Sequence, residues 1–423
     1  MIGIDPMTAG GSALQPARSA RMTERHVLAL GLALSGAFVL AAVIVGGLAG
    51  IGAGPPWAAI HLALAGAATT AISTFVPHFA ITLAGTRPEP ALQRVAALLL
   101  VAAGASSAVL GMTLVGTTWA AAGAAAMVAG LVLTAWQTVS PLRNPLARRH
   151  PIVTASYLVA IAEMAAGISL GGMVALGLDP VLEAWPTLRA AHAWITLLGA
   201  VSLTIFGTLV YLAPTILGAR IRAGGWLVAG TIGMLAGPPI ATVGFALGSA
   251  SVAIAGAAIT LLGAIGQVGY VADVVRRRGP YTSEHDWRRV AVWHLFAGTG
   301  WFALAVAAAL ADLVGGRPLA GWSIGHLAVP LVAGWMLQEL VGSWTHLAPT
   351  VTPGDADRHA AQRRVLAGAS RLRPIAWNAG VAVTWAGLAL GTAPVAAVGG
   401  AVLGFAVTVS AVQLLRALTL GRY

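Results

Sequence analysis

The chain has 423 residues, of which 58% are hydrophobic and only 9% are charged, and its formal net charge is +11 at pH 7. Soluble domains carry about 25% charged residues, so this composition excludes a water-soluble globular enzyme. Cysteine is absent, which excludes disulfides, iron–sulfur clusters, covalently attached haem and thiolate-bound zinc. Any metal is therefore held by His, Met, carboxylate or backbone ligands.

Residues 1–25 are polar and contain glycine and proline, and they predict a disordered cytoplasmic tail rather than a signal peptide. Residues 26–423 then predict a single transmembrane domain, because apolar stretches of about 20 residues or more recur, each long enough to cross a bilayer as a helix. The expected spans are 26–50, 57–84, 91–115, 117–139, 151–177, 187–217, 224–247, 249–274, 287–313, 321–349, 371–391 and 394–416. The predicted fold class is an all-α polytopic membrane protein with twelve transmembrane helices.

All 24 basic residues are arginine, and their distribution gives the orientation. With the N-terminus inside, 22 of them fall on inner segments and only Arg189 and Arg317 fall outside. The positive-inside rule therefore predicts that both termini are cytoplasmic. The basic charge then serves topology, with the lipid bilayer as its partner and no nucleic acid. We expect a multi-pass protein of the bacterial cytoplasmic (inner) membrane.

Three histidines begin spans that run from outside to inside. His61 opens span 2, His192 opens span 6 and His326 opens span 10, and they are 131 and 134 residues apart. Leu-Ala-Pro-Thr follows twice, at 212–215 and 347–350. This period predicts three four-helix units, each with a histidine near the outer end of its second helix. The structural alternative is that each histidine only binds a neighbouring carbonyl at the interface.

Twelve spans with outer histidines on helices 2, 6 and 10 resemble subunit I of the haem–copper oxidases and nitric oxide reductases, above all the C-family oxidases. The arrangement also resembles the membrane portion that precedes the cupredoxin domains of some actinobacterial copper nitrite reductases. On helix 2 the similarity lies in His61 followed by residues 65–67. On helix 6 it lies in His192 together with Gly199, Gly207, Tyr211 and Pro214. On helix 10 it lies in residues 322–326, continued by 334–335 and Pro349.

The resemblance implies roles for these histidines. His61 matches the low-spin haem ligand, His326 the high-spin haem ligand and His192 a copper ligand. The second helix 10 histidine is replaced by Ala328, and 224–248 contains no histidine for the expected helix 7 pair. A complete binuclear site is therefore not expected. Two cofactors stay open: a b-type haem ligated by His61 and His326, or copper bound by His61, His192 and His326.

Ionisable groups inside the spans suggest a proton path or a quinol site. These groups are Glu163 in span 5, and Glu339 and His346 on one face of span 10. The alternative is that the carboxyls are protonated or hydrogen-bonded to neighbours and that His346, like His78, is structural. His294 is expected to extend toward the inner interface.

The function predicted from these features is electron transfer, or nitric-oxide or copper handling, by a membrane protein that binds haem b, copper or both. Its electron partner would be a quinol, or a periplasmic or extracellular cupredoxin or cytochrome. Whether it is an enzyme stays open. The alternative is a secondary transporter of the major-facilitator type, because 269–273 followed by Arg276, Arg277 and Arg278 resembles that family's inner-loop signature. That family repeats as six helices plus six, unlike the four-helix period found here.

Overall fold

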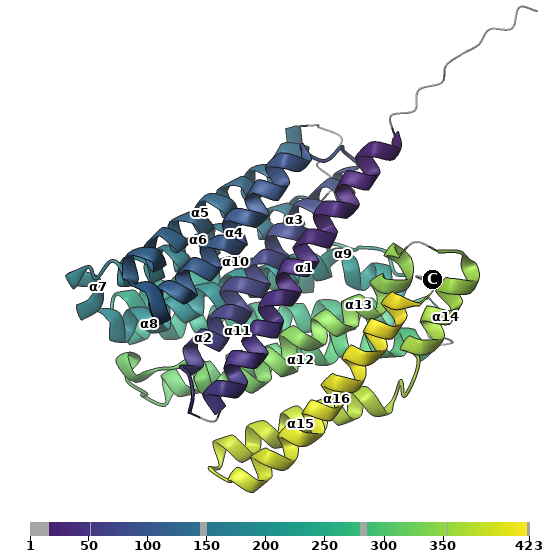
Figure 1. Cartoon of the computed structure of the whole chain (residues 1–423). Helices are drawn as coiled ribbons and strands as arrows, with labels where there is room; N and C mark the ends of the chain where they lie inside the picture. The colour runs from purple at the N-terminus through teal and green to yellow at the C-terminus, as the bar shows by residue number, and fades with distance from the viewer. Residues whose placement is uncertain (1–16, 51, 144–149, 280–285, 353, 421–423) are drawn as a thin grey trace, which may run out of the picture.

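The computed structural model describes residues 17–50, 52–143, 150–279, 286–352 and 354–420. The regular elements of this part of the chain are all helical, and the long helices run alongside one another as a bundle (Figure 1). The α-helices are α1 (Ala17–Gly50), α2 (Pro56–His61), α3 (Thr69–Ala84), α4 (Ala91–Leu110), α5 (Thr117–Val139), α6 (Pro151–Ala175), α7 (Asp179–Glu183), α8 (Trp185–Ala193), α9 (Ser202–Leu217), α10 (Gly225–Ala246), α11 (Ala250–Arg276), α12 (Asp286–Val314), α13 (Leu337–Val351), α14 (Ala356–Leu366), α15 (Leu372–Ala389) and α16 (Ala393–Thr419). The π-helical stretches are η1 (Leu62–Ala68), η2 (Gly111–Val115), η5 (Trp194–Val201) and η9 (Val329–Met336), and η3 (Ser140–Arg143), η7 (Leu319–Gly321) and η8 (Ile324–Leu327) are short 3₁₀ turns.

Eleven stretches among the described residues are long and apolar enough to cross a membrane, so the chain is a multi-pass membrane protein of the all-α class. Their ends agree with eleven of the predicted spans within three residues. The remaining predicted span, 371–391, forms helix α15, which is not among the eleven. Arg373, Pro374 and Asn378 make this helix less apolar. The count of twelve therefore stays a prediction.

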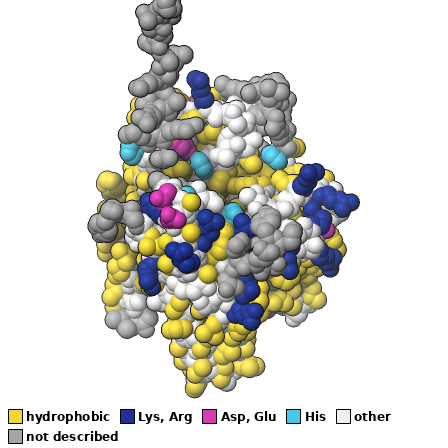
Figure 2. Space-filling view, turned by 90° about the vertical axis from the view of Figure 1, so that its right-hand side faces the viewer, with side chains coloured by type: hydrophobic (Ala, Val, Ile, Leu, Met, Phe, Trp, Pro, Cys, Tyr) yellow, Lys and Arg dark blue, Asp and Glu magenta, His cyan; other side chains and the backbone are white. Residues whose placement is uncertain are grey.

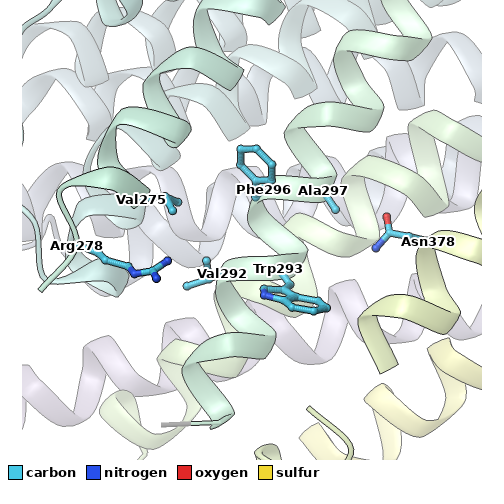
Figure 3. Close-up of a pocket in the computed structure, with 7 residues that line it drawn as sticks. All are labelled: Val275, Arg278, Val292, Trp293, Phe296, Ala297 and Asn378. Atoms are coloured by element: carbon cyan, nitrogen blue, oxygen red, sulfur yellow. The ribbon is translucent and has the colours of Figure 1, made fainter. Parts of the chain in front are cut away.

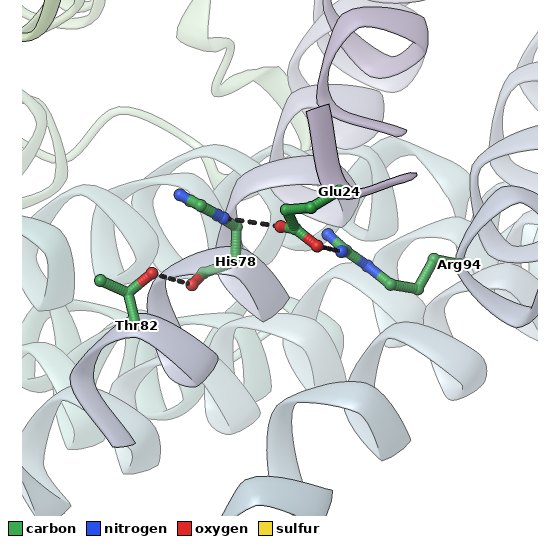
Figure 4. A network of polar contacts seen from close by, with 4 residues as sticks. All are labelled: Glu24, His78, Thr82 and Arg94. Carbon is green, nitrogen blue, oxygen red and sulfur yellow. Dashed lines mark hydrogen bonds and ion pairs between the residues drawn. The ribbon is translucent and has the colours of Figure 1, made fainter. Parts of the chain in front are cut away.

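The first helix corrects one predicted boundary. Helix α1 begins at Ala17, so the predicted tail of residues 1–25 is too long, and residues 1–16 lie outside the described residues. Glu24 anchors this early part of α1 to two neighbours, because its carboxylate accepts hydrogen bonds from His78 of α3, at 2.8 Å, and from Arg94 of α4 (Figure 4). Burial opposes ionisation of Glu24, but the His78 hydrogen bond and the Arg94 charge together hold its pKa below the ordinary value of 4.5.

The two ends of the bundle differ in chemistry. The histidine end is the end at which α2, α7 and α8 lie (Figure 1). The arginine end is the opposite one, where α14 and the C-terminal part of α16 lie. Viewed face-on, the arginine end carries many arginine side chains and few acidic ones (Figure 2). This asymmetry is the structural counterpart of the 22-to-2 split of arginines along the sequence.

Glycine brings three helix pairs into close contact, α4 with α5, α10 with α11 and α15 with α16. A Cβ atom added to Gly263 of α11 would lie 2.7 Å from the backbone of Gly233 in α10, and one added to Gly387 of α15 would lie 2.4 Å from the backbone of Ala396 in α16. Small residues permit such backbone approach in membranes, where packing rather than hydrophobic burial drives helix association. These pairs occupy the third and fourth positions of the three predicted four-helix units.

The helix that carries His192 lies at the centre of the bundle. In the stretch Trp185–Leu217, formed by α8, η5 and α9, 78% of the most apolar 18-residue window is buried, against 17% for the first and last spans. At its histidine end, Trp194 packs with Phe245 and Trp322, with ring centroids 5.2–5.7 Å apart. The most buried span therefore carries an aromatic cluster at its histidine end.

Candidate functional site

The three predicted histidines all precede a π-helical stretch. His61 ends α2 just before η1, His192 lies near the end of α8 before η5, and His326 lies in η8 before η9. π-Helices are rare and frequently occur at functional sites. The three second helices also contain proline near the arginine end, namely Pro77, Pro214 and Pro349. The prolines belong to the repeat found in the sequence, whereas the π-helical stretches are a shared backbone feature that sequence reasoning did not predict.

His61 and His192 form a pair. Their ring centroids are 6.2 Å apart and their planes differ by 15°. His61 Nδ1 lies 2.8 Å from the carbonyl oxygen of Trp57, and His192 Nδ1 lies 2.9 Å from that of Gly167. A carbonyl only accepts, so both Nδ1 atoms carry a hydrogen, which in a neutral imidazole leaves the lone pair on Nε2. Metal-ligating histidines are held in this way.

The two rings lie close enough to contribute to one site. They are stacked, with centroids 6.2 Å apart, and imidazole nitrogens bind metals at about 2.0–2.1 Å. Both side chains are half-buried at the histidine end. The pair is therefore a candidate for two ligands of one metal ion.

His326 has a different partner. Its Nε2 lies 2.5 Å from the Asp312 carboxylate, which also accepts from Arg317 at 3.1 Å. Within the described part of the chain, no three or more His, Cys, Asp or Glu side chains form a group that could hold a metal. The three imidazoles therefore do not form one group among the described residues, because His326 contacts a carboxylate, and the three-imidazole copper site stays a prediction. The haem bridging His61 and His326 stays a prediction.

Glu163 lies inward of the histidine pair, between α6 and η5. Gly167, which accepts the His192 hydrogen bond, is one turn of α6 away, a rise of about 6 Å. The side chain is 5% exposed, and neither carboxyl oxygen has a hydrogen-bond partner among the described residues. It packs against Gly199, where an added Cβ would lie 2.8 Å from Oε2.

Glycines of the other two histidine-bearing stretches face aromatic rings. Gly66 of η1 packs against Phe38 of α1, and Gly334 of η9 packs against Trp301 of α12. In each case the facing residue comes from the first helix of the predicted unit, as Glu163 does. Of these three glycine contacts, the one in the middle predicted unit is made by a carboxyl. A buried polar group of this kind costs stability, which points to a functional role for Glu163.

Glu339 is a second buried carboxyl, closer to the arginine end. It is 3% exposed, packs against Gly298 of α12, and has no hydrogen-bond partner within the described ranges. His346 does not hydrogen-bond to it; the His346 ring instead stacks on Trp287, with centroids 6.0 Å apart. The sequence-based grouping of Glu339 and His346 on one helical face therefore gives no direct contact.

A polar network next to Glu339 was missed from the sequence. His294 is fully buried, so the prediction that it extends to the interface is wrong. Its Nδ1 lies 2.9 Å from Gln338 Oε1, and Gln338 Nε2 donates to Asn378 Oδ1 at 3.1 Å. Trp301 Nε1 also donates to that oxygen, at 2.6 Å. Single amides within otherwise apolar spans were the available signal.

The sequence matches no protein-family model and no curated protein. The resemblance to the haem–copper oxidases accordingly stays a prediction.

Proposed function

We propose that this chain is a metal-binding electron-transfer protein of the membrane, with twelve transmembrane helices in three four-helix units and both termini in the cytoplasm. The observation that carries the proposal is the His61–His192 pair, with both Nδ1 atoms bonded to backbone carbonyls and the rings 6.2 Å apart. Imidazole ligands without thiolates suit copper and haem iron. Such a centre exchanges single electrons with a redox partner when it is bound.

Other residues of the chain orient the two imidazoles and hold a proton near them. The carbonyl oxygens of Trp57 and Gly167 fix the tautomer and orientation of the two imidazoles, which lowers the entropic cost of binding an ion. Glu163, one turn inward, holds or gives up a proton when the charge at the pair changes. The half-buried position of the pair at the histidine end gives access to a periplasmic or extracellular cupredoxin or cytochrome.

The test is metal analysis and a reduced-minus-oxidised absorption spectrum of the purified chain and of three variants. We expect His61→Ala and His192→Ala to lose the bound metal. His326→Ala should keep it, because the His326 side chain contacts Asp312 instead of the pair. A b-type haem spectrum that is lost in His61→Ala and in His326→Ala but retained in His192→Ala would support the bis-histidine haem instead. Unchanged metal content in all three variants would overturn both proposals.

A second candidate, proton-coupled transport, is favoured by the two membrane-buried carboxyls. Glu163 and Glu339 have no hydrogen-bond partners among the residues described, and such groups mark ion pathways in transporters. The four-helix repeat of glycine-packed pairs and π-helical stretches argues against a six-plus-six transporter. Proteoliposomes that take up protons down a gradient without any bound metal would favour transport over electron transfer.

A further inference from the structure

A groove of about 330 Å³ opens on the side of the bundle toward the arginine end (Figure 3). It lies where α11, α12 and α15 meet, and its walls are almost entirely apolar. Arg278, Val292, Trp293, Phe296 and Asn378 are among the residues that line it. Trp293 and Phe296 are 40% and 46% exposed, so two aromatic rings are available to an occupant.

Arg278 supplies a positive charge at this groove. It follows the C-terminal end of α11, is exposed, and forms no ion pair with any described residue. The adjacent Arg277 differs, because it pairs with Asp273 at 2.7 Å and donates to the Arg220 carbonyl at 2.8 Å. The guanidinium of Arg278 is therefore available to an anion. Arginine suits phosphate because its planar group forms two parallel hydrogen bonds.

The depth of the groove matches one leaflet of a bilayer. Its innermost residue on α12, Ala297, is eleven residues from the start of that helix at Asp286, which is about 16 Å along the axis. Half of a typical hydrocarbon core is about 15 Å. A molecule bound here therefore has its charged part near Arg278, at the level of the lipid head groups, and its apolar part along α12 toward the midplane.

The polar side chain in the wall offers little to a quinone. Asn378 Oδ1 already accepts from Trp301 and Gln338, and Asn378 Nδ2 donates to the Pro374 carbonyl at 2.8 Å. A quinone head group needs hydrogen-bond partners that this amide has already committed. An anionic head group, in contrast, can bind Arg278, which forms no ion pair with a described residue.

We propose that the groove is a binding site for an anionic phospholipid, with its phosphate on Arg278 and one acyl chain along Val292, Trp293 and Phe296. The lipid lies between α12 and α15 and attaches the α15–α16 pair to the rest of the bundle. Juxtamembrane arginines contribute about 1 kcal/mol each to anionic lipid binding, which corresponds to about fivefold in affinity.

The test uses the full chain, delipidated in detergent and titrated with phosphatidylglycerol or phosphatidylcholine of identical acyl chains, with bound lipid counted by native mass spectrometry. We expect phosphatidylglycerol to bind about fivefold more tightly than phosphatidylcholine. Arg278→Gln should abolish that preference. Arg276→Gln is the matched control, since this exposed arginine in the same segment does not line the groove, and it should change affinity by less than about twofold.

A second variant tests the apolar part of the site. Ala297→Leu fills the groove and should weaken the binding of both lipids while leaving the preference for phosphatidylglycerol intact. Equal affinity for the two lipids in the unmodified chain, or equal loss in Arg276→Gln and Arg278→Gln, would overturn the proposal. Displacement of phosphatidylglycerol by an isoprenoid quinone from the unmodified chain, but not from Ala297→Leu, would assign the groove to a quinol instead.

Discussion

Replacing Glu163 with leucine should make the protein more stable. The carboxyl is 5% exposed and has no hydrogen-bond partner among the described residues, and an uncompensated buried polar group costs about 1–3 kcal/mol. Leucine is of similar size, and the mismatch in shape costs less than about 1.5 kcal/mol. We therefore expect Glu163→Leu to raise the free energy of unfolding by about 1–2 kcal/mol, although proton exchange at the histidine pair would be lost.

Equilibrium unfolding in mixed micelles, followed by tryptophan fluorescence, measures this change. Ile168→Leu is the matched control, because Ile168 is buried on the same helix and the substitution removes no polar group. Its effect should stay within about 1.5 kcal/mol. If Glu163→Leu were instead less stable than Ile168→Leu by more than about 1 kcal/mol, the carboxyl would be a structural element. Retention of Glu163 for function would then be refuted.

Three further predictions concern packing, pH and topology. Gly263→Ala should lower the free energy of unfolding by about 1–3 kcal/mol, because the added Cβ would lie 2.7 Å from backbone. Gly36→Ala is the control, since nothing lies within 4 Å of the added Cβ. In the same unfolding assay it should be neutral or stabilising by up to about 1 kcal/mol. Because the pKa of Glu24 is lowered on folding, the stability that its carboxylate contributes is present above the ordinary pKa of 4.5 and is lost as pH falls through the folded pKa. Thermal unfolding of the unmodified chain and of Glu24→Gln should therefore differ at neutral pH, by about 1–3 kcal/mol. The two should converge in acid. Reporter fusions should place Gly116 outside and Arg278 inside, and the reverse result would refute the assigned orientation.

The helical organisation could be predicted from the sequence because its signals are local. Apolar length gives the spans, and the arginine distribution gives the two chemically distinct ends. The local signal is weaker in the segment that forms α15, since Arg373 and Asn378 lower its hydropathy although it packs as a helix against α16. The π-helical stretches were not predictable, because a change in backbone hydrogen bonding leaves no pattern in residue type.

The candidate site was predicted only in part, since contacts between distant segments decide it. Equal depth suggested that three histidines meet, and the structure brings together His61 and His192. His326 binds Asp312, which lies 14 residues earlier and in another helix, and no spacing rule indicates that contact. The packing of Glu163 against Gly199 likewise joins two different helices, and no spacing rule indicates it.

The number of imidazoles on the metal tests the central claim most directly. Pulsed electron paramagnetic resonance of the copper-loaded full chain counts the imidazole nitrogens coupled to the ion. We expect two imidazoles in the unmodified chain and in His326→Ala, and one or no bound copper in His192→Ala. Three coupled imidazoles in the unmodified chain, or an unchanged spectrum in His192→Ala, would contradict a centre built on His61 and His192.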